Sequence, residues 1–154
     1  MAQRRLRDAR QDHDGSLNGD HVRPATIDLR TSIYRDAHAI IEAEYDKELR
    51  VEEVAHRVAS SRRQLQRAFA EIGDTSFVRD LASVRAERGA ELLATAAVSV
   101  REVAQRVGYS QAAHFAKVFR THHGVTPSTF RRQLRGKPGA SMSADGAAAA
   151  TPPA

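Results

Sequence analysis

The sequence predicts an all-α protein of about seven helices, arranged as two helix-turn-helix subdomains that a long linker helix joins. Three observations support this fold class. Apolar residues recur at helical spacing through the region from about residue 31 to residue 135. Two segments of this region contain, in order, the residue types that a helix-turn-helix requires. These two segments also resemble each other in sequence.

The segment 100–119 predicts two helices with a tight turn between them. Gly108 follows an apolar helical face, where a chain leaving one helix needs a residue that tolerates positive φ. Ser110 can cap the next helix, and Phe115 and Phe119 give that helix a buried face. The small Ala104 lies where the two crossing helices must approach closely.

The same pattern occurs forty-nine residues earlier. VEEVAHRVASS at 51–61 and VREVAQRVGYS at 100–110 are identical at seven of eleven positions. Leu65 and Phe69 then mirror the two phenylalanines, with a one-residue insertion. Two generic helical hairpins are the alternative interpretation, but repetition of the whole pattern favours two helix-turn-helix units.

The chain divides into three parts. Residues 1–30 are polar without a sustained period, and we expect a disordered arm. Residues 31–135 form the domain, with subdomains at 31–74 and 96–135 and the linker helix at 75–95. Residues 136–154 are rich in Gly, Ser, Ala and Pro, and we expect a disordered tail.

The first half of the domain is expected to contain three helices and the start of the linker helix. The first helix begins at Thr31 or Ser32 and ends near Leu49, and the next two occupy 51–58 and 61–72. Thr75 or Ser76 caps the linker helix, which extends to about residue 94. Its length of roughly 27 Å would hold the second helix of each helix-turn-helix, the candidate recognition helix, about one DNA turn from the other. The helix at 61–72 is the first candidate recognition helix.

The second half is expected to contain three further helices. Ser99 caps the first of them, and the second recognition helix runs from Ser110 or Gln111 to about residue 122, where Gly124 ends it. Thr126 caps the last helix, with Pro127 in its first turn, where the missing N–H costs nothing.

Composition limits the function classes. The net charge of +5 and the pI of about 10.2 favour a polyanionic partner, and residues 98–135 hold seven Lys or Arg against Glu102 alone. The chain has no Cys, which excludes disulfides, Cys-ligated zinc and a thiol nucleophile. No segment approaches the roughly 20 apolar residues of a membrane span. We therefore expect a cytoplasmic protein, associated with the nucleoid and not with a membrane.

Polar residues on the two recognition helices suit DNA. Burial of the apolar face of 61–72 leaves three arginines and a glutamine facing outward. Arginine can make two hydrogen bonds to the major-groove edge of guanine, and glutamine can do the same with adenine. An ordinary polar helix face is the alternative. The second recognition helix offers glutamine, histidine, lysine and arginine outward, and arginines at 131, 132 and 135 suit backbone phosphates.

The sequence resembles the DNA-binding domain of the AraC/XylS transcription regulators. The resemblance covers about residues 32–134, and it is most specific in GYSQAAHFAKVFRTHHGVTPSTFRR. The first half matches through Leu65-Gln66-Arg67, Phe69, Gly73, Ser76-Phe77 and Arg85. The resemblance implies that both recognition helices enter successive major-groove segments of an asymmetric site, with the protein bound as a monomer.

The resemblance also implies which residues meet DNA. By position, the base-contacting residues of the family fall on Arg63, Gln66, Arg67, Gln111, Ala112, Ala113, Ala116 and Lys117. We add the outward-facing Arg62 and leave out Ala113 and Ala116. The expected base contacts are then Arg62, Arg63, Gln66, Arg67, Gln111, Ala112 and Lys117. The expected phosphate contacts are Ser61, Ser110, His114, Arg120, Arg131 and Arg132. Alanine can only touch a thymine methyl, so we expect the first helix to supply most of the sequence specificity.

The sequence departs from the family pattern at three positions. Ala59 stands where the first turn often has Gly, so either it accepts a strained left-handed backbone or the turn differs. Asp80 stands where the family often has Tyr, and Gly89 where it often has Ala. A close helix–helix contact would explain Gly89.

These observations predict a sequence-specific transcription regulator, of the short stand-alone type and an activator, with double-stranded DNA and RNA polymerase as partners. Because only thirty polar residues precede the domain, we expect no small-molecule effector domain, and because the sequence has no Cys we expect no fusion to a DNA-repair methyl acceptor. No HExxH motif or Gly-rich phosphate loop is present, so we expect no enzyme activity, cofactor or metal. The alternative is a protein-interaction module of the same fold with only nonspecific DNA binding.

Overall fold

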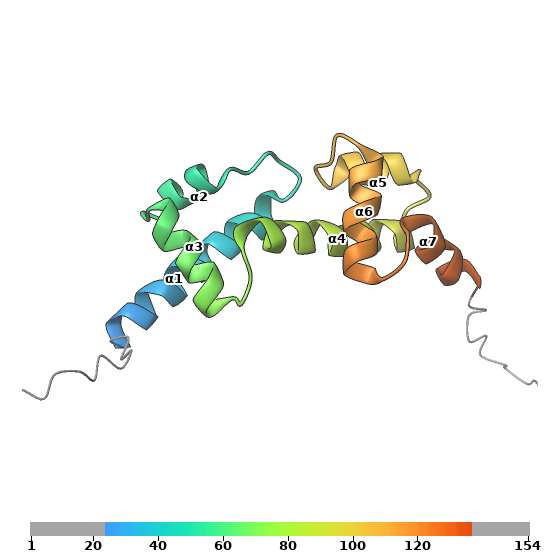
Figure 1. Cartoon of the computed structure of the whole chain (residues 1–154). Coiled ribbons are helices and arrows are strands. Elements are labelled where there is room, and N and C mark those ends of the chain that lie inside the picture. Colours follow the sequence, from blue (N-terminus) through green and yellow to red (C-terminus); the bar gives the residue numbers. More distant parts are fainter. Residues whose placement is uncertain (1–23, 137–154) are drawn as a thin grey trace, which may run out of the picture.

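The computed structural model describes residues 24–136, which form seven helices and no strand (Figure 1). In chain order the helices are α1 (Pro24–Glu44), α2 (Val51–Arg57), α3 (Arg62–Ile72), α4 (Phe77–Thr95), α5 (Val100–Arg106), α6 (Ala112–His123) and α7 (Pro127–Gly136). This arrangement confirms the all-α fold class. Across residues 24–136, no helix has the length and apolar character needed to cross a membrane.

Helix α1 begins earlier than predicted. It starts at Pro24 instead of Thr31 or Ser32, and it ends at Glu44 instead of Leu49. Its first turns carry the exposed Ile27 and Leu29, so no buried period reveals them in the sequence. Residues 24–30 of the predicted arm are thus helical; the rest of that arm, and the predicted tail beyond residue 136, lie outside the range that the structure describes.

The first core lies between α1, α2, α3 and the first half of α4. The ring of Phe69 in α3 meets Tyr34 and Phe77 edge to face, with centroid distances of 5.2 and 5.9 Å. The buried residues of this core are Ile33, Ala37, Ile41, Val54, Ala55, Leu65, Ala68, Phe69, Phe77, Leu81 and Val84. These include Leu65 and Phe69, which the sequence predicts to mirror the two phenylalanines of the second subdomain.

The second core lies between the end of α4 and helices α5 and α6. Phe115 and Phe119 of α6 are fully buried in it, and their ring centroids are 5.5 Å apart. The other buried members are Leu93, Val103, Ala104, Val107 and Tyr109. Tyr45, in the loop after α1, packs against both cores.

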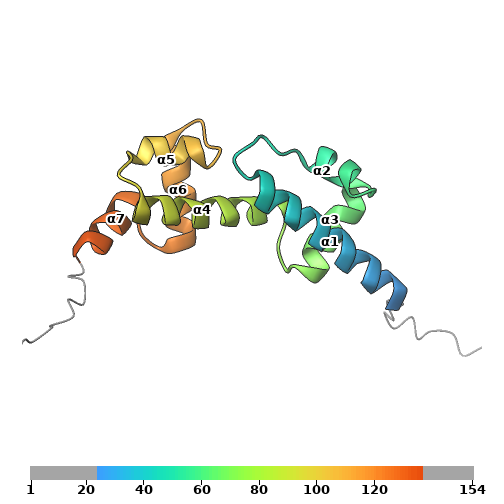
Figure 2. The same ribbon diagram turned by 180° about the vertical axis from the view of Figure 1, so that it is seen from behind.

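Helix α4 connects the two subdomains: it contacts α1 of the first subdomain and α5, α6 and α7 of the second (Figure 1). In Figure 1, α3 lies in front of α1 and α6 in front of α4; Figure 2 shows the reverse order from behind. Both predicted recognition helices therefore lie on one side of the molecule. A Cβ on Gly89 would lie 2.8 Å from the Phe115 ring, which is the close contact that this glycine predicted.

Candidate nucleic-acid interface

The two turns that present the recognition helices have the same backbone geometry. Ala59 has a φ of 50° and Gly108 a φ of 86°, so both lie in the left-handed region. After each turn a backbone N–H donates back across it over 2.8 Å, from Ser60 to the Ala55 carbonyl and from Tyr109 to the Ala104 carbonyl. Ala59 thus accepts the strained backbone, and the sequence repeat is also a repeat of structure.

The two recognition helices begin differently. The Ser61 hydroxyl accepts from the N–H of Gln64, and the Gln64 side chain accepts from the Ser61 N–H, which makes a capping box. The N-cap of α6 is Gln111, whose side chain makes no cap hydrogen bond. Ser110 is therefore not the cap that the sequence predicted. Its exposed side chain stands just before the helix.

Helix α3 turns its polar residues outward, as predicted. Arg62, Arg63, Gln66 and Arg67 are all exposed, opposite the buried Leu65, Ala68 and Phe69. Arg62 pairs with Glu52 at 2.7 Å and Arg67 with Glu71 at 3.4 Å. Within residues 24–136 no ion pair includes Arg63. Arg63 and Gln66 are therefore the residues of this face that need break no carboxylate contact to meet a base.

Helix α6 presents a face of different chemistry. Gln111, Ala113, His114, Lys117 and Arg120 are exposed. Ala112, a predicted base contact, is half-buried and packs against the second core, because it lies three residues before Phe115 on the same helical face. This position leaves Ala112 less available than predicted.

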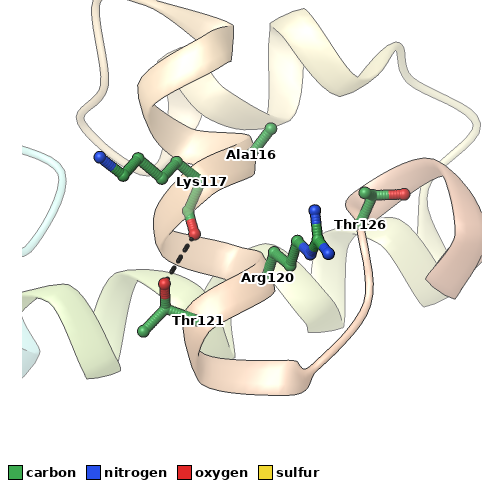
Figure 3. A pocket seen from close by; sticks show the side chains of 5 residues that line it. All are labelled: Ala116, Lys117, Arg120, Thr121 and Thr126. Carbon is green, nitrogen blue, oxygen red and sulfur yellow. Dashed lines mark hydrogen bonds between the residues drawn. The ribbon is translucent and has the colours of Figure 1, made fainter.

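A groove separates α6 from the start of α7. It has a volume of about 440 Å³ and is lined by Ala116, Lys117, Arg120, Thr121 and Thr126. In Figure 3 the Arg120 side chain extends toward Thr126, whereas Lys117 extends to the opposite side of α6. The Thr121 hydroxyl donates to the Lys117 carbonyl over 3.0 Å, and Thr126 caps α7 by accepting from the Thr129 N–H, as predicted. Arg120 is thus free to meet an anion in this groove.

Arg131 does not have the exposed position that its predicted phosphate contact requires. Its Nε and Nη2 atoms are buried and have no hydrogen-bond partner among residues 24–136. The residue lies four positions after the buried Pro127, on the face of α7 that turns toward the domain. Arg132, the next residue, is exposed and can contact phosphate.

Arg85 is a positioning residue whose role the sequence analysis did not identify. Its Nε donates to the Tyr45 carbonyl over 2.7 Å and its Nη2 to the Lys47 carbonyl over 2.8 Å. The same guanidinium lies over the ring of Tyr109, in the turn before α6. Burial raises the pKa of the Tyr109 hydroxyl, against a smaller lowering effect of Arg85. Only its place in the resemblance singled out Arg85 in the sequence.

Comparison with known proteins gives consistent results. Residues 54–133, just over half of the chain, match the family described as "Helix-turn-helix domain". The Msm operon regulatory protein of Streptococcus mutans serotype c is 31% identical over 96 residues, which are 62% of this chain and 34% of that protein. The chain spans about a third of the length of the first curated relatives that it matches.

Solved structures share the fold. An AraC-type transcriptional regulator from Chromobacterium violaceum superposes with a TM-score of 0.65 and 30% identity, over 70% of this chain and 95% of that one. The DNA-binding domain of the global transcriptional factor AdpA, in complex with a target DNA, superposes with a TM-score of 0.62 and 27% identity, over 68% of this chain and 93% of that one.

Proposed function

The chain belongs to the AraC/XylS family of helix-turn-helix DNA-binding transcription regulators, and we propose that it recognises an asymmetric promoter site with two recognition helices. Helices α3 and α6 would enter successive major-groove segments on one face of the duplex. The observation that carries this proposal is the pair of equivalent turns at Ala59 and Gly108, which present two exposed polar helices on one side of the molecule.

The proposal assigns sequence reading mainly to α3. Arg63 and Gln66 are exposed and suit bidentate hydrogen bonds to guanine and adenine edges. Arg62 and Arg67 would join them after releasing their surface ion pairs, each worth little in water. In α6, Gln111 and Lys117 are the polar candidates for base contact. Ala113 and Ala116 can offer only a methyl group.

The proposal assigns phosphate binding mainly to α6 and α7. Arg120 beside Thr126, and the exposed Arg132, would hold the backbone on the α7 side of the major groove. Ser61, Ser110 and His114 are exposed near the helix starts and would add contacts. We further propose binding as a monomer, activation through contact with RNA polymerase, and action in the cytoplasm at the nucleoid.

Selection from a random duplex library at about 150 mM salt tests the proposal, because specific binding must survive salt that weakens phosphate contacts. We expect an asymmetric motif with two informative blocks about one turn, roughly 34 Å, apart. A single informative block would mean that α3 reads sequence and the second subdomain only grips the backbone. No enrichment would overturn the proposal and favour a protein-interaction module with nonspecific DNA binding.

A further inference from the structure

A second groove lies on the other side of α6, between this helix and the first half of α4. Its volume is about 530 Å³. The residues that line it are Arg79, Ala82, Ser83, His114, Lys117, Val118, Thr121 and His122. Lys117 also lines the groove beside α7, so α6 is a ridge with a groove on each side.

The exposed start of α4 lines one hollow with α3 and another with α6. Val78, of which 72% is exposed, lines a hollow together with Arg62 and Gln66 of α3. The next residue, Arg79, lines the groove beside α6. Val78 and Arg79, neighbours at the start of α4, thus line hollows beside α3 and beside α6 respectively.

The groove beside α4 is cationic. Between residues 24 and 136, neither Arg79 nor Lys117 takes part in an ion pair. Asp80, next to Arg79, is turned away and lies 2.7 Å from the Nδ1 atom of His38 in α1. None of the residues that line the groove is acidic, and Glu87 lies 3.6 Å from one of them, His122. Two cationic side chains, Arg79 and Lys117, therefore face solvent in this groove.

We propose that the linker helix is itself a DNA contact, in which Arg79, beside Lys117 in the same groove, binds the sugar–phosphate backbone between the two recognition helices. This inference rests on the proposed function. A helix in the major groove has one backbone strand on each side, and α6 has a groove on each side. Arg120 would hold the strand beside α7, and Arg79 would hold the strand beside α4, where the duplex passes from one recognition helix to the other.

The test compares Arg79→Ala with Arg88→Ala, a matched control. Arg88 is nine residues further along α4, which places it about half a turn away, on the opposite face of the helix. It pairs with Glu91 and lies 5.9 Å from the Tyr45 ring centre. Both changes remove one arginine from the same helix, but only Arg79→Ala removes it from the groove.

We expect Arg79→Ala to weaken cognate and random duplexes alike and to reduce the salt slope by about 0.9. Raising salt from 50 to 200 mM should then cost this variant about 3.5-fold less affinity than the wild type. Arg88→Ala should keep the wild-type slope, and Arg79→Lys should restore it. Neutral methylphosphonates placed between the two informative blocks should weaken the wild type but not Arg79→Ala.

The outcomes separate this inference from the proposed function. If the wild type selects a site but Arg79→Ala and Arg88→Ala have the same slope, the linker contact is wrong and the two-helix reading stands. Equal sensitivity of the wild type and Arg79→Ala to methylphosphonates would also overturn it. If the wild-type protein enriches no duplex in the selection, the proposed function is wrong, and the inference that rests on it is wrong as well.

Discussion

The guanidinium carbon of Arg85 lies 5.1 Å from the centre of the Tyr109 ring. The same guanidinium donates to two carbonyl groups of the loop that follows α1, at Tyr45 and Lys47. One side chain of α4 thereby holds a loop of the first subdomain against the turn that presents α6. A Cβ on Gly108 would lie 2.9 Å from the carbonyl oxygens of Tyr45 and Asp46, so this junction also requires the glycine.

We expect Arg85→Ala to lower the free energy of unfolding by about 1–3 kcal/mol, because two carbonyl groups would lose a charged donor. Urea denaturation measures this change. Arg101→Ala, on the exposed surface of α5, is the control and should have little effect. A loss as small as that of the control would show that Arg85 does not hold the two subdomains together.

Gly89→Ala should destabilise the protein although alanine favours a helix by about 1 kcal/mol over glycine. The new methyl group would lie 2.8 Å from the Cε2 and Cζ atoms of the buried Phe115 ring, and such overpacking costs about 1–3 kcal/mol. Thermal unfolding monitored by circular dichroism measures the net effect. Gly136→Ala, which meets no atom within 4 Å, is the matched control. A gain in stability for Gly89→Ala would show that α4 and α6 can move apart cheaply.

The two equivalent turns should respond oppositely to exchange of their central residues. Ala59→Gly should stabilise the protein by up to about 1 kcal/mol. It removes left-handed backbone strain of about 1–2 kcal/mol, but glycine also raises the conformational entropy of the unfolded chain, which offsets part of this gain. Gly108→Ala should destabilise it, because its φ is 86° and its Cβ would crowd two carbonyl groups. Chemical denaturation of both variants tests this. The same sign for both would contradict equivalence of the turns.

Readout and positioning should separate in DNA binding. Arg63→Ala should cost about 1–3 kcal/mol on the selected site and relax the preference at individual base pairs. Arg120→Ala should weaken selected and random duplexes evenly and reduce the salt slope by about one unit. Titrations at several salt concentrations distinguish the two patterns. If Arg63→Ala reduces affinity evenly, α3 positions the protein and does not read bases.

The fold and the two recognition helices could be predicted from the sequence because the sequence patterns that indicate them are local. The apolar spacing of α3 and α6, the caps at Ser99 and Thr126 and the left-handed requirement at Gly108 all depend on residues within a few positions. The repeat at 51–61 and 100–110 then shows that the two turns are equivalent, and the backbone angles confirm it.

Contacts between residues far apart in the chain could not be predicted in this way. Arg131 turns inward, although it sits in a polar segment that suggested DNA contact. The first turns of α1 have an exposed apolar side chain at Ile27, and Arg30 pairs with Glu71 of α3, forty-one residues away. These turns carry no buried apolar side chain, so the sequence has no apolar period there.

Sequence alone was therefore enough for the number of helices, their order, the two turns and the outward side of α3, because short-range sterics and helical periodicity govern them. Tertiary packing decided which cations stay available to a polyanion. It draws Arg85 into the subdomain junction and Arg131 into the domain, and it places Arg79 beside Lys117 in one groove. The physical reason is that a side chain's burial and charge partners depend on the elements folded against it, which no local pattern encodes.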